Sequence, residues 1–297
     1  MMDIERGLRG SVWAAVLKEG LGASAVLTCP PGMRPVNWSV FARLGMKAAY
    51  PNFPVGFEEE FIDARDRIGD HLKQLRRRGV DLAMFSFPRA AAFDLPIHAE
   101  VARQPETRIL GLSAWSEARM SSATRRKVSR AERHGLVVRP CSSEDGECIH
   151  KLYVESVRRK GGGLRYGVRY FQALCEASSR SSAVSVGIVR REPGDIVGFI
   201  SLLHGPEISY YLHGGYAIEA ATFRPGYLAM YWAIRRCCAL GCETLNLLTS
   251  PADQPGLVAF KESFGGLTQE RIHYRVPLGF FGNCADLSLR TLRGLGI

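Results

Sequence analysis

The stretch from Tyr210 to Gly266 constrains the fold of this chain more than any other part of the sequence. Its pattern predicts a strand, a polar loop, an apolar helix that begins at Pro225-Gly226, a second strand, and a short helix that ends at Gly265-Gly266. Proline is favourable in the first turn of a helix, because its missing N–H would have no partner in the helix there. Strands and helices mixed in this order exclude an all-α or all-β domain, and we expect an α+β fold.

The segments before this stretch continue the pattern. A helix over 113–134 has serines at its start and Gly135 as its stop. In the first hundred residues, a helix over 57–78 carries apolar residues at near-helical spacing and ends before Gly79. Further helices are predicted at 143–160 and 169–177, and strands at Ser11–Leu17, Ala23–Cys29, Asp81–Phe87, Thr107–Leu112, Leu136–Arg139, Ala183–Arg190, Ile196–Leu203 and Glu207–His213.

The composition is that of a globular protein, and 297 residues can bury one large core or two ordinary ones. A net charge of +10 and a pI near 9.4 favour a polyanionic partner, such as nucleic acid, a phosphorylated cofactor, a nucleotide-sugar or an anionic lipid surface. The eight cysteines include no Cys-x-x-Cys pair, so we expect free thiols and no metal. No secretory signal or long apolar run is found in the sequence, and we expect a cytoplasmic location.

The order of elements from 107 to 280 resembles the Gcn5-related N-acetyltransferase (GNAT) fold, and two motifs are similar to those of the Fem family. These are Phe223-Arg224-Pro225-Gly226-Tyr227-Leu228 and the Phe-Lys-x-x-Phe-Gly-Gly sequence that begins at Phe260. Fem proteins move an amino acid from aminoacyl-tRNA onto an amine. The resemblance implies two GNAT-like units in tandem, the first degenerate, with mixed, mostly antiparallel sheets flanked by helices. We expect a degenerate unit over 1–112, a C-terminal unit over 113–280, and a tail over 281–297 that packs back on the first unit.

The pair Phe260-Lys261 is the predicted catalytic motif. Helical spacing places Leu257, Lys261 and Phe264 on one stripe, so the ammonium lies on a mostly buried face and needs a partner there. The resemblance implies that Lys261 stabilises the oxyanion that forms when the amine attacks the ester, a role that a fixed cation can fill. The alternative is a lysine that extends its ammonium to solvent or forms a structural ion pair.

The predicted donor-binding residues are Arg224, Gly226 and Tyr227, at the start of the apolar helix. In GNAT enzymes the amides of the matching turn bind the pyrophosphate of coenzyme A at a helix N-terminus. Here the spacing is short, and Tyr227-Leu228 replaces small residues, as in the Fem family. A helix start selected only for capping and packing is the alternative.

Two segments supply the predicted acceptor-binding residues. Arg165 and Tyr166 follow a run of three glycines, which suits an anionic acceptor, although a solvated surface loop has the same composition. On the strand before the apolar helix, alternation places Tyr211 and His213 on one face and Tyr210 on the other. These polar groups would orient the amine or relay its proton. The alternative is a histidine that serves only the core.

A basic stripe on the helix over 113–134 is the predicted nucleic-acid-binding surface. Its positive side chains follow helical spacing and would contact a phosphate backbone. The alternative is an ordinary solvated helix face, and no aromatic residues interleave with the stripe for base stacking. The stripe consists of Arg125, Arg126, Lys127, Arg130 and Arg133.

Together these motifs predict a Fem-like acyltransferase that forms an amide by transferring an aminoacyl group from aminoacyl-tRNA to an amine of a peptidoglycan precursor or small molecule. No cofactor is expected for this reaction. The first alternative is an acyl-CoA-dependent N-acyltransferase of polysaccharide or small-molecule biosynthesis, with acetyl-CoA or another acyl-CoA as co-substrate. Asn246 keeps this alternative open, because Fem sequences often have an aspartate on that strand. The second alternative is a non-catalytic module that binds tRNA or a nucleotide-sugar. Peripheral contact with a membrane is compatible with all three.

Overall fold

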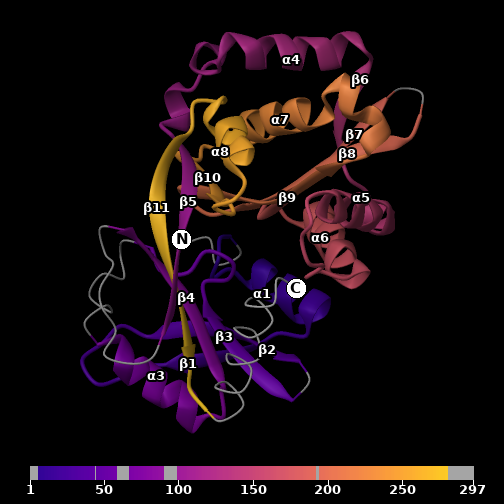
Figure 1. The fold of residues 1–297 in the computed structure, drawn as a ribbon. Helices are drawn as coiled ribbons and strands as arrows, with labels where there is room; N and C mark the ends of the chain where they lie inside the picture. The colour runs from indigo at the N-terminus through magenta and orange to yellow at the C-terminus, as the bar shows by residue number, and fades with distance from the viewer. Residues whose placement is uncertain (1–5, 44, 59–66, 90–98, 192–193, 280–297) are drawn as a thin grey trace. The chain divides into compact units, whose positions relative to one another are not determined.

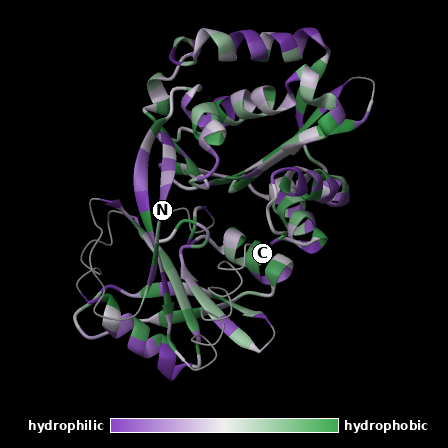
Figure 2. Cartoon of the chain, in the orientation of Figure 1, coloured by the Kyte–Doolittle hydropathy of each residue, from purple (hydrophilic) through white to green (hydrophobic). Residues whose placement is uncertain are grey.

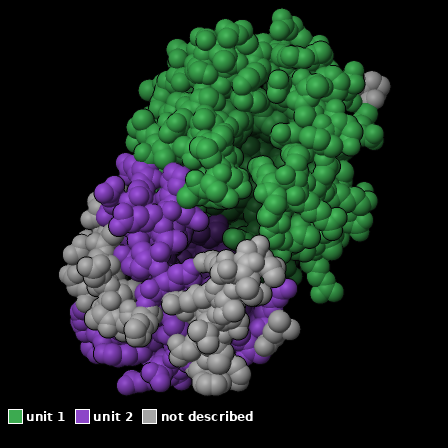
Figure 3. Space-filling model, in the orientation of Figure 1, with its two compact units in different colours: residues 1–21, 106–268 green, residues 22–105, 269–297 purple. Residues whose placement is uncertain are grey.

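The computed structural model describes residues 6–43, 45–58, 67–89, 99–191 and 194–279 (Figure 1). The chain divides into two compact units (Figure 3). Unit 1 contains Met1–Leu21 and Glu106–Thr268, and unit 2 contains Gly22–Pro105 and Gln269–Ile297. The expected domains over 1–112 and 113–280 remain a prediction, and the expected tail over 281–297 lies outside the described residues.

Unit 1 is built on a mixed sheet with the strand order β5-β10-β9-β8-β7-β6. Every neighbouring pair is antiparallel except β9 and β10, which are parallel. The strands are β5 (Glu100–Leu110, which enters unit 1 at Glu106), β6 (Leu136–Pro140), β7 (Val184–Arg191), β8 (Ile196–His204), β9 (Ile208–Tyr216) and β10 (Thr244–Thr249).

Helices cover both faces of this sheet (Figure 1). On one face α7 packs on the core residues Val189, Ile200 and Leu202. The other face carries α5 and α6, where Phe171 of α6 meets Phe199 of β8 edge to face. The helices of unit 1 are α1 (Ser11–Leu21), α4 (Ser122–Arg133), α5 (Gly146–Arg159), α6 (Val168–Arg180), α7 (Pro225–Ala239) and α8 (Pro255–Glu262), with short 3-10 turns at Leu112–Ala114, Glu117–Arg119, Ser143–Asp145 and Ile218–Phe223.

The strands of unit 2 follow the order β1-β2-β3-β4-β11, with a parallel pair at β3 and β4 and antiparallel pairs elsewhere. Its core is aromatic: Phe57 stacks on Phe87 at 4.8 Å between ring centroids, and Trp38 meets Phe57 edge to face. Hydrophobic residues run along the strands of both units in Figure 2. The elements are β1 (Ser24–Thr28), β2 (Val36–Arg43), β3 (Met46–Pro51), α3 (Ile68–Arg77), β4 (Leu82–Pro88) and β11 (Leu267–Pro277), which enters unit 2 at Gln269.

Several sequence predictions are confirmed. The strands expected from Leu136 to His213, the helices over 143–160 and 169–177, and the apolar helix that begins at Pro225 all form near the expected bounds. Gly79 and Gly135 follow the ends of α3 and α4 with φ of +72° and +73°. This left-handed conformation is the one that glycine adopts without strain, so both glycines end their helices as predicted.

Other predictions are wrong. The strand expected at Ser11–Leu17 is the helix α1, whose buried residues Trp13, Val16 and Leu17 follow helical spacing. The helix expected over 113–134 forms only from Ser122, because Ser121 caps its start by accepting a hydrogen bond from the Thr124 amide at 3.1 Å. Phe57, expected on the helix over 57–78, lies outside α3 and is fully buried in the unit 2 core. Among the described residues, no helix is long and apolar enough to cross a membrane.

Candidate functional site

The candidate site lies where the parallel strands β9 and β10 of unit 1 stop pairing. Their register covers three residue pairs and ends at Asn246 opposite Tyr210. Beyond this point β9 continues beside β8, while β10 continues beside β5. The two strands therefore share hydrogen bonds only at their beginnings, and the backbone groups that follow are available to other parts of the site.

A β-bulge in β10 follows directly. The pairing of β10 with β5 shifts between Asn246 and Thr249, so that one extra residue is accommodated. Leu248 has φ of +57°, a left-handed conformation that is unfavourable for a residue with a Cβ atom. The Asn246 side chain stabilises it, because its Oδ1 accepts a hydrogen bond from the Leu248 amide at 2.8 Å. The bulge turns backbone carbonyls of β10 toward α8.

Lys261 of α8 binds the backbone of this bulge. Its Nζ donates hydrogen bonds to the carbonyl oxygens of Leu248 at 2.9 Å and Thr249 at 3.3 Å, and the residue is only 2% exposed. Burial lowers the pKa of Lys261 to about 7, while Glu106 raises it and Lys160 lowers it further. The predicted catalytic lysine is therefore neither an extended surface side chain nor one half of a simple ion pair.

A buried carboxylate lies on the next strand. Glu106 of β5 accepts a hydrogen bond from the Asn246 Nδ2 at 3.1 Å through Oε1. Its Oε2 accepts from Arg108, at 3.0 Å from Nε and 2.9 Å from the second guanidinium nitrogen. Sequence reasoning missed Glu106 and Arg108. A glutamate beside a short apolar strand gives no signal of its burial, which follows from the pairing of β5 with β10.

Phe260, the other half of the predicted catalytic pair, contacts Tyr227, which was predicted for the donor and which in turn contacts Lys127, predicted for nucleic acid. Its ring meets the Tyr227 ring edge to face at 5.0 Å. Lys127 of α4 donates a hydrogen bond from Nζ to the Tyr227 hydroxyl at 2.8 Å, and the same Nζ lies 4.5 Å from the ring centroid. Three separate predictions of the sequence, on α4, α7 and α8, thus come together in one cluster.

The start of α7 carries the predicted donor-binding residues. Arg224 precedes the helix with φ of +65°, and its side chain is exposed. A Cβ atom added at Gly226 would lie 3.4 Å from the Tyr216 ring, which is ordinary contact, so packing alone does not demand glycine there. In the first turn of α7, Pro225 has no N–H and the Tyr227 amide donates to the Arg224 carbonyl oxygen at 3.1 Å, so Gly226 supplies the amide that an anion at this helix N-terminus would meet first.

On the opposite face of the sheet, Tyr166 and His213 come together as predicted acceptor residues. Their rings lie 4.6 Å apart, edge to face, and Tyr170 shares a hydrogen bond of 3.0 Å between its hydroxyl and the His213 Nε2. Burial lowers the pKa of His213 to about 3, so the imidazole is neutral at neutral pH. Arg165 is exposed, and its amide donates to the Tyr153 hydroxyl at 3.1 Å.

The prediction that Tyr211 and His213 share one face is wrong. The pairing of β8 with β9 shifts between Ser201 and Leu202, so Ser201 faces His213 while Leu202 faces Tyr211. A bulge of this kind breaks strict alternation of side chains. Tyr211 therefore packs with the α7 core, and His213 lies in the aromatic cluster between β9, α5 and α6.

The basic helix α4 presents its stripe in two parts. Arg126, Arg130 and Arg133 are exposed, and Figure 2 shows α4 as largely hydrophilic. Arg125 instead donates hydrogen bonds to the carbonyl oxygens of Glu117 at 3.1 Å and Met120 at 2.8 Å. The stripe thus combines three solvent-facing arginines with two cations that contact the protein, Arg125 and Lys127.

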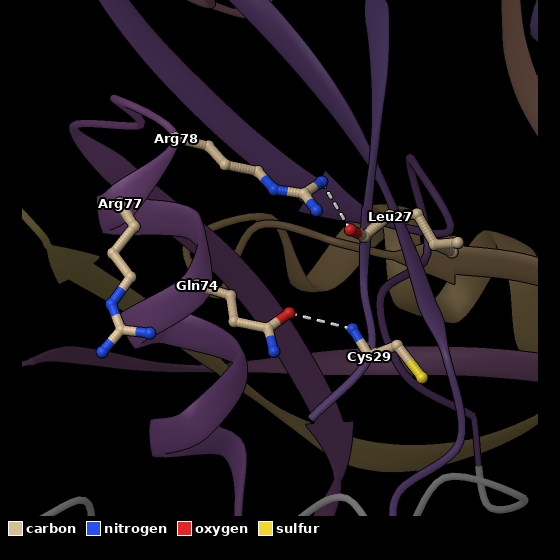
Figure 4. Close-up of a pocket in the computed structure, with 5 residues that line it drawn as sticks. All are labelled: Leu27, Cys29, Gln74, Arg77 and Arg78. Carbon is tan, nitrogen blue, oxygen red and sulfur yellow. Dashed lines mark hydrogen bonds between the residues drawn. The ribbon is translucent and has the colours of Figure 1, made fainter. Parts of the chain in front are cut away.

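Unit 2 has a cavity of about 410 Å³ between β1 and the end of α3 (Figure 4). Arg78 donates to the Leu27 carbonyl oxygen at 2.6 Å, and the Gln74 Oε1 accepts from the Cys29 amide at 2.9 Å. Because β1 is at the edge of its sheet, these side chains bind backbone groups that no strand pairs. Within the described residues, no group of three or more His, Cys, Asp or Glu could hold a metal ion.

Residues 118–262 match the acetyltransferase (GNAT) domain family. No curated protein matches the chain. Among solved structures, FemX is similar with a TM-score of 0.61 and 14% identity, over 89% of this chain and 91% of that one. L-PGS from Bacillus licheniformis has a TM-score of 0.59 and 14% identity, over 92% and 93%. A tandem GNAT protein from the clavulanic acid biosynthesis pathway has a TM-score of 0.52 and 12% identity, over 94% and 93%.

The chain has a Fem-like GNAT fold, in which mixed β-structure is flanked by helices, as the sequence predicted. The domain match supports acyl transfer as its class of reaction.

Proposed function

We propose that the protein transfers an aminoacyl group from aminoacyl-tRNA to a substrate amine. The observation that carries the proposal is the buried Lys261 ammonium on the β10 bulge, next to a cluster in which Phe260, Tyr227 and Lys127 lead to the exposed face of α4. A cation fixed by two carbonyl oxygens beside a basic helix suits a donor that carries both an ester carbonyl and a phosphate backbone.

In the proposed reaction the neutral amine attacks the ester carbonyl of the donor. A carbon–nitrogen bond forms, and the carbonyl oxygen takes the negative charge of the tetrahedral intermediate. Lys261 stabilises this oxyanion, because its position is fixed before the charge develops. The carbon–oxygen bond of the ester then breaks, and the proton lost by the amine passes to the ribose oxygen that leaves. Phe260 shapes the wall of the site beside Tyr227.

The acceptor side is proposed at the aromatic cluster. Arg165 is an exposed cation next to Tyr166, and a neutral His213 lies within hydrogen-bond distance of Tyr170. We propose an anionic, amine-bearing acceptor, either a peptidoglycan precursor or a small molecule. The reaction would take place in the cytoplasm, where charged tRNA is available, and peripheral contact with a membrane would bring a lipid-linked acceptor within reach.

One observation favours a second candidate, an acyl-CoA-dependent N-acyltransferase. The N-terminus of α7 has no side-chain cap, and the Gly226 amide in its first turn is the group that would bind a phosphate there. Acetyl-CoA or another acyl-CoA would then be the co-substrate, and Lys261 would stabilise the same kind of oxyanion.

A donor assay separates the two candidates. Purified protein is incubated with total tRNA charged with labelled amino acids, or with labelled acetyl-CoA, and with a panel of amine acceptors. Label that moves from tRNA to an acceptor supports the proposal. Transfer from acetyl-CoA alone would establish the second candidate. Binding of tRNA in a gel shift with no turnover from either donor would indicate a non-catalytic module.

A further inference from the structure

A continuous path of hydrogen bonds joins Glu106 to Lys261 through the backbone of β10. Glu106 Oε1 accepts from the Asn246 Nδ2 at 3.1 Å, and the Asn246 Oδ1 accepts from the Leu248 amide at 2.8 Å. The Leu248 carbonyl oxygen then accepts from the Lys261 Nζ at 2.9 Å. Each polar group on the path has the partner that its chemistry requires, and the path crosses from β5 to β10 to α8.

Burial makes this path energetically important. Asn246 is fully buried, and Glu106 and Lys261 are 4% and 2% exposed. Charges at such depth interact strongly with each other, and removal of one partner leaves the other poorly compensated. The Asn246 side chain also stabilises the left-handed conformation of Leu248. The direction of the Leu248 carbonyl, which Lys261 binds, therefore depends on Asn246.

The charged groups that influence Lys261 come from two elements, β5 and α5. Glu106 of β5 favours its protonated form, Lys160 at the end of α5 disfavours it, and Arg108 of β5 shares the Glu106 carboxylate. Glu106 is thus the group that opposes the cost of burying the ammonium.

We propose that Glu106 and Asn246 are positioning residues that hold the Lys261 ammonium in place and in its charged form. The residue of β10 on this path, Asn246, is neutral. The negative charge therefore comes from Glu106 on the neighbouring strand β5. The relevance of this inference to catalysis rests on the proposed function. The position and the charge of Lys261, however, can be measured in the protein without substrates. A purely structural network would close the bulge equally well with a neutral amide in place of the carboxylate.

The test is a titration of Lys261 by NMR in protein labelled with carbon-13 at the lysine Cε, with no donor or acceptor present. Lys261→Met assigns the signal. Glu106→Gln keeps an oxygen that can accept from Asn246 but removes the charge. We expect its Lys261 signal to titrate at least about one pH unit lower than in the unmodified protein. The matched control is Glu176→Gln, which removes a carboxylate that pairs with Arg180 on α6.

An unchanged Lys261 titration in a folded Glu106→Gln protein would overturn the proposal. Where that variant does not fold, Arg108→Gln gives an independent test of opposite sign. Loss of the cation that shares the carboxylate should move the Lys261 titration to higher pH, and no movement would also overturn the proposal. Because the readout needs no turnover, it stands apart from the proposed function. A shifted titration together with a fully active Lys261→Met protein would retain the positioning role and reject the catalytic one.

Discussion

At the scale of single residues, Lys261 carries most of the chemical argument, and its substitution is the most direct test. Lys261→Met preserves the length of the side chain and its helix propensity but removes the cation. Loss of one oxyanion-stabilising group typically reduces turnover about a hundred- to thousandfold. We expect a loss of this order in the donor assay, with an unchanged circular dichroism spectrum. Lys151→Met, an exposed lysine on α5, is the matched control.

Turnover of Lys261→Met equal to that of the unmodified protein would reduce Lys261 to a structural role. The buried ammonium would then serve only to bind the carbonyl oxygens of Leu248 and Thr249.

The same residue predicts a pH dependence of stability. Burial lowers the pKa of Lys261 to about 7, against 10.5 for an ordinary lysine. Between these values the unfolded chain binds more protons than the folded one, so the free energy of unfolding rises with pH. Below about pH 7 the ammonium is charged in both states, and its burial cost is fully present. We expect urea unfolding to show that the unmodified protein gains stability relative to Lys261→Met from pH 7 to pH 9.5. A constant difference over that range would mean that Lys261 has an ordinary pKa.

At the scale of secondary-structure elements, α4 makes a prediction about polyanion binding. Replacing Arg126, Arg130 and Arg133 with glutamine removes three exposed cations. Binding of tRNA should weaken, and the slope of log affinity against log salt should fall by about one for each phosphate that the protein no longer binds. The melting temperature should change little, because these side chains face solvent. Arg125→Gln should show the reverse, with lower stability and an unaffected slope, since Arg125 binds backbone carbonyls. A triple variant that melts far lower while tRNA binding stays intact would contradict this assignment.

The helix α3 and the edge strand β1 give a second prediction at this scale. Arg78→Ala removes the hydrogen bond to the Leu27 carbonyl oxygen and should destabilise unit 2 by about 1 kcal/mol, the usual net value of one such bond. Arg77→Ala changes the same cavity wall without this bond and should be neutral (Figure 4). Urea unfolding followed by tryptophan fluorescence measures the change, with Trp38 as the probe in unit 2 and the other three tryptophans in unit 1. Equal effects of the two substitutions would show that the hydrogen bond does not hold β1.

At the scale of the whole molecule, local patterns predicted what depends on neighbours in sequence. The strands expected from Leu136 to His213 and the helix that begins at Pro225 formed as expected, since periodicity and turn residues determine them. Features that depend on strand pairing were missed. The bulge between Tyr211 and His213 places these two side chains on opposite faces of the sheet. The burial of Glu106 became visible only through its partner Asn246. The strands β2, β3 and β11 were also not predicted, and their stability comes from the aromatic core of unit 2.

The identity of the acyl donor decides the function of the whole protein, and a substitution at the start of α7 tests it. If coenzyme A is the donor, its pyrophosphate must approach the first turn of α7 at Gly226 and Tyr227, and a side chain at 226 would block that approach. Gly226→Val should be tolerated by the fold, because a Cβ atom there lies at ordinary contact distance from Tyr216. Under the proposed function, calorimetry with acetyl-CoA shows no binding to the unmodified protein, and Gly226→Val retains its affinity for tRNA. Micromolar binding of acetyl-CoA that Gly226→Val abolishes would replace aminoacyl-tRNA with an acyl-CoA as the donor, while the role of Lys261 at the oxyanion would stay the same.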